Sequence, residues 1–180
     1  GAVSLLQQHH IDIAEIDTIT AAVHPAQVAI VCEPLLDKQR PANAYEAQFS
    51  VPYIVAASLC RQRFTLEELQ PEALTDRDIL ALAARVDYVD DPQSSYPRYY
   101  SGGLTLQLND GQQLSHHVAV NRGADKAPLS TAEIREKFLA NACRRVSLAE
   151  ANNIADIVEQ LDSAADLSEL ACSVSSNLSP

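Results

Sequence analysis

The sequence predicts an α+β fold, in which a small antiparallel sheet of three to four strands is covered by helices and followed by C-terminal helices. Three observations support this prediction. Leucines alternate with polar residues beside an Asp-Gly pair, the stretch from Val51 to Cys60 is apolar nearly all round, and two Ser-x-x-Glu sequences precede helical patterns after residue 128. We divide the chain into an α+β domain, residues 1–125, and a helical segment, residues 126–180.

The clearest element is a hairpin between residues 102 and 120. From Gly102 to Asn109, Leu104, Leu106 and Leu108 alternate with Thr105 and Gln107, which is the period of a half-buried strand. The Asp110-Gly111 pair predicts a tight turn, because glycine permits positive φ. The stretch Gln112–Val120 then returns as the partner strand.

The stretch Val51–Cys60 predicts a central helix. Ser50 is a natural N-cap, and Pro52 suits the first turn. A helix without a polar face is buried on several sides, so this helix should pack on the sheet and on further elements.

The remaining elements follow from shorter patterns. β-branched residues predict a strand over 13–23, and alternation predicts another over 85–90. The stretch Ala26–Leu36 fits a strand or a short helix. Capping boxes at Thr65/Glu68, Ser130/Glu133 and Ser147/Glu150 mark starts of turns or helices, and a last short helix is expected over 163–172.

Composition narrows the classes of function. The 180 residues carry a net charge of −11, which disfavours binding to nucleic acid. No stretch reaches the roughly 18 consecutive apolar residues of a membrane span. The four cysteines form no CxxC pair and lie among apolar residues, so we expect buried thiols in a reducing cytoplasm. The chain has no methionine, and we expect it to be a piece of a longer protein.

The start of the central helix is the best candidate for a binding site. A helix N-terminus offers unpaired N–H groups and partial positive charge, and Ser50 and Tyr53 lie there. Lys38 and Arg40 lie just upstream, and a guanidinium suits a carboxylate. The alternatives are structural: Tyr53 as a core residue, Ser50 as an N-cap only, Lys38 and Arg40 as solvated loop charges, and Glu46 as a partner of Arg40 or a structural residue.

The histidines point to no metal site. His116 and His117 are neighbours in a predicted strand, so their side chains face opposite sides of the sheet. HExxH, a glycine-rich phosphate loop and GxSxG are all absent from the sequence. We therefore predict neither a metal nor a cofactor.

Three stretches resemble the small domain of the MmgE/PrpD family, which includes 2-methylcitrate dehydratase, cis-aconitate decarboxylase and iminodisuccinate epimerase. They are EAQFSVPYIVAASL from Glu46, DGQQLSHHVAVNRG from Asp110 and APLSTAEIREKF from Ala127. The resemblance covers residues 13–170. It implies a lyase or epimerase acting on a small di- or tricarboxylate without a metal in most members. It also implies a missing N-terminal helical domain, with most of the catalytic residues, on which residues 126–180 would pack.

By this resemblance, Tyr53 matches a tyrosine that lines the active-site cleft, and we take it as the catalytic candidate, with Ser50, Arg40 and Lys38 as substrate-binding candidates. The isolated chain would supply a cleft wall and be inactive. The rival hypothesis is a free-standing interaction module without an active site, which dimerises through its C-terminal helices. The coding sequence upstream and sedimentation would distinguish the two.

Overall fold

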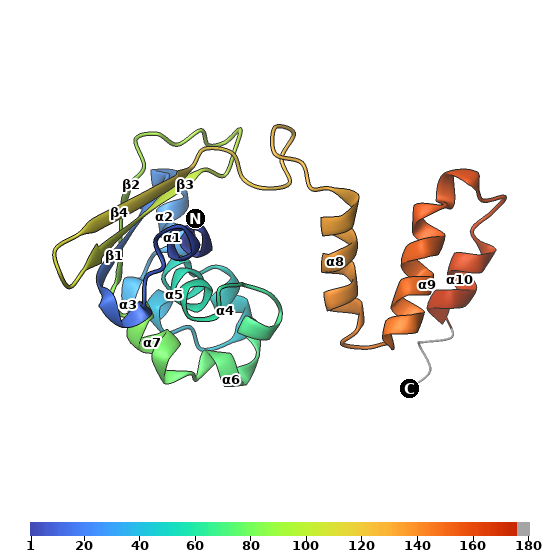
Figure 1. The fold of residues 1–180 in the computed structure, drawn as a ribbon, viewed down its shortest axis with the longest axis horizontal. Helices are drawn as coiled ribbons and strands as arrows, with labels where there is room; N and C mark the ends of the chain where they lie inside the picture. The colour runs from blue at the N-terminus through green and yellow to red at the C-terminus, as the bar shows by residue number, and fades with distance from the viewer. Residues whose placement is uncertain (176–180) are drawn as a thin grey trace. The chain divides into compact units, whose positions relative to one another are not determined.

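The computed structural model describes residues 1–175. It divides the chain into two compact units, with the boundary between Ala127 and Pro128. The first unit contains the sheet and most helices, and the second contains helices only. Each unit is described below by itself (Figure 1).

The sheet of the first unit has four strands in the order β2-β1-β3-β4. They are β1 (Ile16–Val23), β2 (Val86–Asp90), β3 (Gly102–Leu108) and β4 (Gln113–Val118). The predicted α+β class is confirmed. The sheet is mixed, because β2 runs parallel to β1 while the other pairs are antiparallel. The helices between β1 and β2 carry the chain back, so β2 enters the sheet in the same direction as β1.

One face of the sheet supplies the core. Ile19, Leu104, Leu106 and Leu114 are buried there, and the helices of the unit gather on this side (Figure 1). The opposite face is polar. Register places Asp87, Thr20, Thr105 and Ser115 side by side across the four strands. This alternation is the one that the hairpin sequence predicts.

The helix α5 (Val51–Arg61) is the central helix that the sequence predicts, one residue longer at its end. Ala56, Ala57 and Leu59 on it are fully buried, and it contacts α7, α1 and α3. The other helices of the unit are short: α1 (Ala2–His9), α2 (Pro25–Val31), α3 (Leu35–Gln39), α4 (Ala44–Gln48), α6 (Pro71–Leu74) and α7 (Arg77–Ala83), with 3₁₀ turns η1 (Ile13–Glu15) and η2 (Glu67–Leu69). The ambiguous stretch 26–36 thus contains no strand: it is helical up to Val31 and again from Leu35, with a turn between the two helices.

The second unit contains α8 (Thr131–Ala142), α9 (Leu148–Glu159), the turn η3 (Leu161–Ser163) and α10 (Ser168–Ser175). Ser130 and Ser147 form the two predicted capping boxes. Arg135 on α8 ties the helices together, since its guanidinium donates to Asp156 (2.6 Å) and Glu159 (3.0 Å) on α9. The last helix starts five residues later than the sequence predicts.

The cysteines are only partly as expected. All four are free, and Cys32 is buried in the core. Cys60 is half-buried, and Cys143 and Cys172 are exposed. The expectation of four buried thiols was therefore wrong for the second unit, where most side chains face outward.

Candidate functional site

The N-cap of α5 is built by Ser50, which is fully buried. Its hydroxyl accepts from the backbone N–H of Tyr53 (3.0 Å) and donates to the carbonyl of Lys38. One side chain therefore starts α5 and holds the segment that precedes α4. Both polar functions of the Ser50 hydroxyl are used inside the protein.

Tyr53 lies in the first turn of α5 and has no exposed surface. Its hydroxyl donates to the carbonyl of Glu68 (2.7 Å), and its ring packs edge-on against Phe64, with centroids 6.4 Å apart. Burial, followed by the nearby charges of Glu68 and Asp76, raises the pKa of Tyr53 to about 12. The hydroxyl is thus a neutral donor tied to the loop after α5.

Lys38 joins two helix ends. Its ammonium donates to the carbonyl of Ile30 (2.5 Å), in the last turn of α2, and to that of Phe49 (2.7 Å), just after α4. A cation at the carboxyl end of a helix is stabilised by the helix dipole and by the unpaired carbonyls there. Lys38 therefore holds these segments around the start of α5.

Arg40 differs from the other three candidates. Its side chain is exposed, and no hydrogen bond or ion pair of its guanidinium occurs among residues 1–175. Glu46 does not pair with it. The Glu46 carboxylate instead accepts from the N–H of Ala42 (2.9 Å) and the amide of Asn43 (2.7 Å), which confirms its structural reading. Arg40 thus keeps its donors available to an anion.

Glu68 is a buried carboxylate that the sequence showed only as half of a capping box. It accepts from Arg63 (3.0 Å) and from the N–H (2.7 Å) and hydroxyl (2.8 Å) of Thr65. Desolvation alone would raise the pKa of Glu68, but the hydrogen bonds from Arg63 and Thr65 hold it below its ordinary value of 4.5. Glu68 anchors the loop whose carbonyl receives Tyr53.

This environment predicts a pH dependence of stability. A carboxyl whose pKa is lower in the folded chain binds its proton more tightly when unfolded. The stability that Glu68 contributes is therefore present above the unfolded pKa and is lost as pH falls through the folded pKa. Between about pH 5 and pH 3 we expect wild type to lose more stability than Glu68→Gln in urea unfolding. Glu72→Gln, at an exposed position in α6, is the control, and equal slopes for all three proteins would contradict the prediction.

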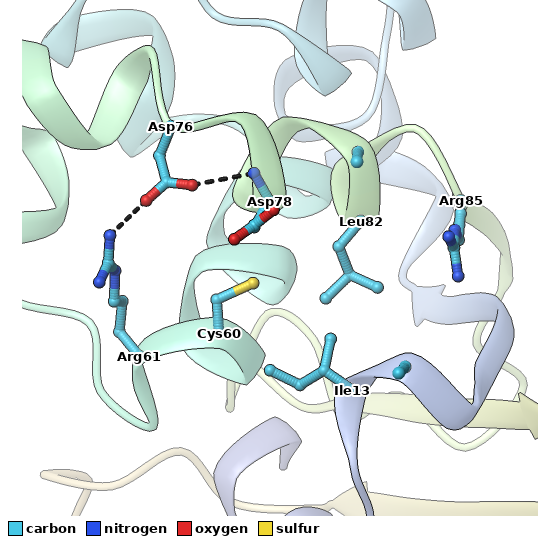
Figure 2. A pocket seen from close by; sticks show the side chains of 9 residues that line it. Ile13, Cys60, Arg61, Asp76, Asp78, Leu82 and Arg85 are labelled. Carbon is cyan, nitrogen blue, oxygen red and sulfur yellow. Dashed lines mark hydrogen bonds and ion pairs between the residues drawn. The ribbon is translucent and has the colours of Figure 1, made fainter.

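A cavity of about 400 Å³ lies at the other end of α5 (Figure 2). Four charged residues line it: Arg61, Asp76, Asp78 and Arg85. The rest of its wall is formed by small and apolar residues, namely Ile13, Ala14, Cys60, Ala81 and Leu82. Asp76 forms an ion pair with Arg61 and accepts from the N–H of Asp78 (2.9 Å), as Figure 2 shows. Burial raises the pKa of the Cys60 thiol to about 11, so this group is not a thiolate at neutral pH.

A second cavity, of about 420 Å³, lies between α5 and the core face of the sheet. Small and apolar residues such as Ala21, Val51 and Gly102 line it, together with the imidazole of His116. Neither cavity includes Tyr53, Ser50, Lys38 or Arg40. Residues from segments far apart in the sequence line both cavities, so no local sequence pattern predicts them.

Asp91 and His117 form a further pair that the sequence did not reveal. The Asp91 side chain is 1 % exposed, and its carboxylate lies 3.0 Å from Nε2 of His117. The imidazole crosses Gly103, where an added Cβ would come within 3.3 Å of its ring. The pair links the end of β2 to β4.

Among residues 1–175, no three His, Cys, Asp or Glu side chains are grouped so as to hold a metal ion. The same residues include no helix long and apolar enough to cross a membrane.

The family model of the MmgE/PrpD C-terminal domain matches residues 1–163. The chain belongs to the MmgE/PrpD family. It is 29% identical over 142 residues to a cis-aconitate decarboxylase-like protein of Aspergillus oryzae, covering 78% of this chain and 29% of that protein. It is 25% identical over 132 residues to cis-aconitate decarboxylase of Mus musculus, covering 72% and 27%, and 29% identical over 158 residues to 2-methylcitrate dehydratase of Cupriavidus necator, covering 81% and 30%.

The match confirms the resemblance seen in the three sequence stretches. This MmgE/PrpD chain spans less than a third of the length of these relatives. A role of Tyr53, Ser50, Lys38 and Arg40 in substrate binding stays a prediction.

Proposed function

We propose that this chain is the C-terminal domain of an MmgE/PrpD-type lyase that acts on a small di- or tricarboxylate. The observation that carries the proposal is the family match over residues 1–163, together with relatives named as decarboxylases of cis-aconitate and dehydratases of 2-methylcitrate. Elimination next to a carboxylate needs a base for the proton and donors for the developing negative charge. We propose that the base belongs to the N-terminal helical domain and that this chain forms a cleft wall.

Within that wall, we propose that Arg40 contacts a substrate carboxylate. The exposed guanidinium and its free donors support this assignment, since Arg binds carboxylates through two parallel hydrogen bonds. For Ser50, Lys38 and Tyr53 we propose a supporting role, because their polar atoms bond within the chain. Direct contact of Tyr53 with substrate would require its bond to the Glu68 carbonyl to open.

We further propose that the helices after residue 127 pack on the N-terminal helical domain. Ile134, Leu148 and Leu167 are 55%, 60% and 63% exposed, which is a large apolar surface for short helices. Four free cysteines, two of them exposed, support a reducing compartment, and we propose the cytoplasm. We also propose that the enzyme is a homodimer.

The test compares the 180-residue chain with the same chain joined to the N-terminal domain. We expect turnover of 2-methylcitrate or cis-aconitate only in the joined protein. Arg40→Ala should raise KM for the substrate by about tenfold or more, and Arg40→Lys should recover part of the loss. Turnover by the 180 residues alone, or a joined protein inactive on every di- and tricarboxylate tried, would overturn the proposal.

A further inference from the structure

The cavity at the end of α5 contains charged groups that the fold does not use fully. Asp76 serves the structure itself, since it pairs with Arg61 and caps α7 by accepting from the N–H of Asp78 (2.9 Å). The other two charged residues of the wall are Asp78 and Arg85. The binding capacity of the cavity therefore depends on these two side chains.

Asp78 and Arg85 both keep unused hydrogen-bonding groups. Within the part of the chain that the structure describes, the Asp78 carboxylate has no hydrogen bond and no ion pair. The Arg85 guanidinium donates to the carbonyl of Ile16 (2.6 Å), and its other N–H groups have no partner among the same residues. A carboxylate and a guanidinium are thus available to a ligand.

The two groups lie at opposite ends of one face of α7. Together with Ala81 and Leu82, they follow the i, i+3, i+4, i+7 spacing of a helix face. Arg85 extends the last turn, because its N–H donates to the carbonyl of Leu82 (3.0 Å). In Figure 2 the side chain of Leu82 lies between those of Asp78 and Arg85. A rise of about 1.5 Å per residue places the backbones of residues 78 and 85 about 10 Å apart.

The wall between the charged ends is apolar. Figure 2 shows the side chains of Leu82 and Ile13 pointing toward each other, with Cys60 beside them. Burial, followed by the charges of Asp76 and Asp78, raises the pKa of the Cys60 thiol. The field of the two carboxylates favours a cation at this end of the cavity. An apolar cavity of about 400 Å³ with a few polar groups is typical of small-molecule sites.

We propose that this cavity binds a small zwitterion of dipeptide length, with its ammonium at Asp78, its carboxylate at Arg85 and an apolar body against Leu82 and Ile13. Hydrogen bonds of about 2.8 Å at each end leave about 5–10 Å between the two charges of the ligand. An extended dipeptide spans about 7 Å, and a single amino acid about 3.5 Å. A free amino acid is therefore too short to reach both groups.

This site is separate from the proposed substrate site. The 11 residues of α5 place its two ends about 15 Å apart, with Ser50 at one end and the cavity at the other. A di- or tricarboxylate also has no cation for Asp78. All residues of the wall belong to the first unit, so the cavity is complete within it. The inference therefore goes beyond the proposed lyase activity and does not depend on it.

The first test varies the ligand in an NMR titration of the ¹⁵N-labelled 180-residue chain. With the dipeptide alanyl-leucine we expect saturable shifts of the Ala81 and Leu82 amides and a Kd of about 1 mM or tighter. N-acetyl-alanyl-leucine has no ammonium, alanyl-leucine amide has no carboxylate, and leucine is too short. Each should bind about tenfold more weakly or worse. No saturable shift up to about 10 mM dipeptide, or equal binding of the acetylated dipeptide, would overturn the proposal.

The second test varies the protein. Asp78→Asn and Arg85→Gln should each raise the Kd of alanyl-leucine by about tenfold or more, and Arg85→Lys should recover part of the loss. Ala81→Phe fills the cavity without changing its charges and should abolish binding. Glu72→Gln and Arg77→Gln, at exposed positions outside the wall, are the matched controls and should leave the Kd unchanged.

Circular dichroism confirms that each variant is folded before its Kd is compared. The exposed position of Asp78 makes Asp78→Asn the most conservative of the changes. Binding that both Asp78→Asn and Ala81→Phe leave at the level of wild type would place the dipeptide elsewhere, and the proposal would then be wrong.

Discussion

Tyr53→Ala is expected to lower the free energy of unfolding by about 3–5 kcal/mol, as for other large aromatic side chains removed from a core. Tyr53 is fully buried and packs against Phe64, so its removal leaves a cavity at the start of α5. Urea unfolding followed by circular dichroism measures the loss.

Tyr53→Phe separates packing from hydrogen bonding. It keeps the ring but leaves the Glu68 carbonyl without its donor, which should cost about 1–3 kcal/mol. If Tyr53 only supports the fold, Tyr53→Phe should leave kcat of the joined protein nearly unchanged under conditions in which it is folded. A loss of kcat by about a hundredfold or more in a folded variant would show that the hydroxyl acts on substrate instead.

The sequence predicted most of the architecture, because local patterns determine it. The alternation around Asp110-Gly111 identified the hairpin of β3 and β4, and the N-cap at Ser50 identified the start of α5. The capping boxes at Ser130 and Ser147 located α8 and α9. The parallel pairing of β2 with β1 was not predicted, since it depends on how the intervening helices return the chain.

The candidate site was predictable only in part. A helix N-terminus beside two cations is visible in the sequence, but the partners of those groups are not. The Lys38 ammonium donates to carbonyls at the ends of α2 and α4, and the Tyr53 hydroxyl donates to the carbonyl of Glu68 in the loop after α5. Such contacts arise from tertiary packing between segments. The same holds for Asp91, whose burial depends on His117 reaching it over Gly103.

Lys38→Met is expected to destabilise the chain by about 2–3 kcal/mol, because it removes two hydrogen bonds from a charged donor and leaves the carbonyls of Ile30 and Phe49 without that donor. Methionine keeps most of the aliphatic stem, so the change reports the ammonium rather than packing. Arg40→Met is the matched control. Its guanidinium is exposed, and the change should stay within about 0.5 kcal/mol.

The two variants together distinguish a residue that supports the fold from a residue that contacts the substrate. In the joined protein, Arg40→Met should keep the stability of wild type and lose affinity for substrate. Lys38→Met should lower the stability of the joined protein. It should raise KM only to the extent that the start of α5 moves. Equal stabilities for Lys38→Met and Arg40→Met in urea unfolding would mean that the two carbonyls find other donors, and the supporting role of Lys38 would then be wrong.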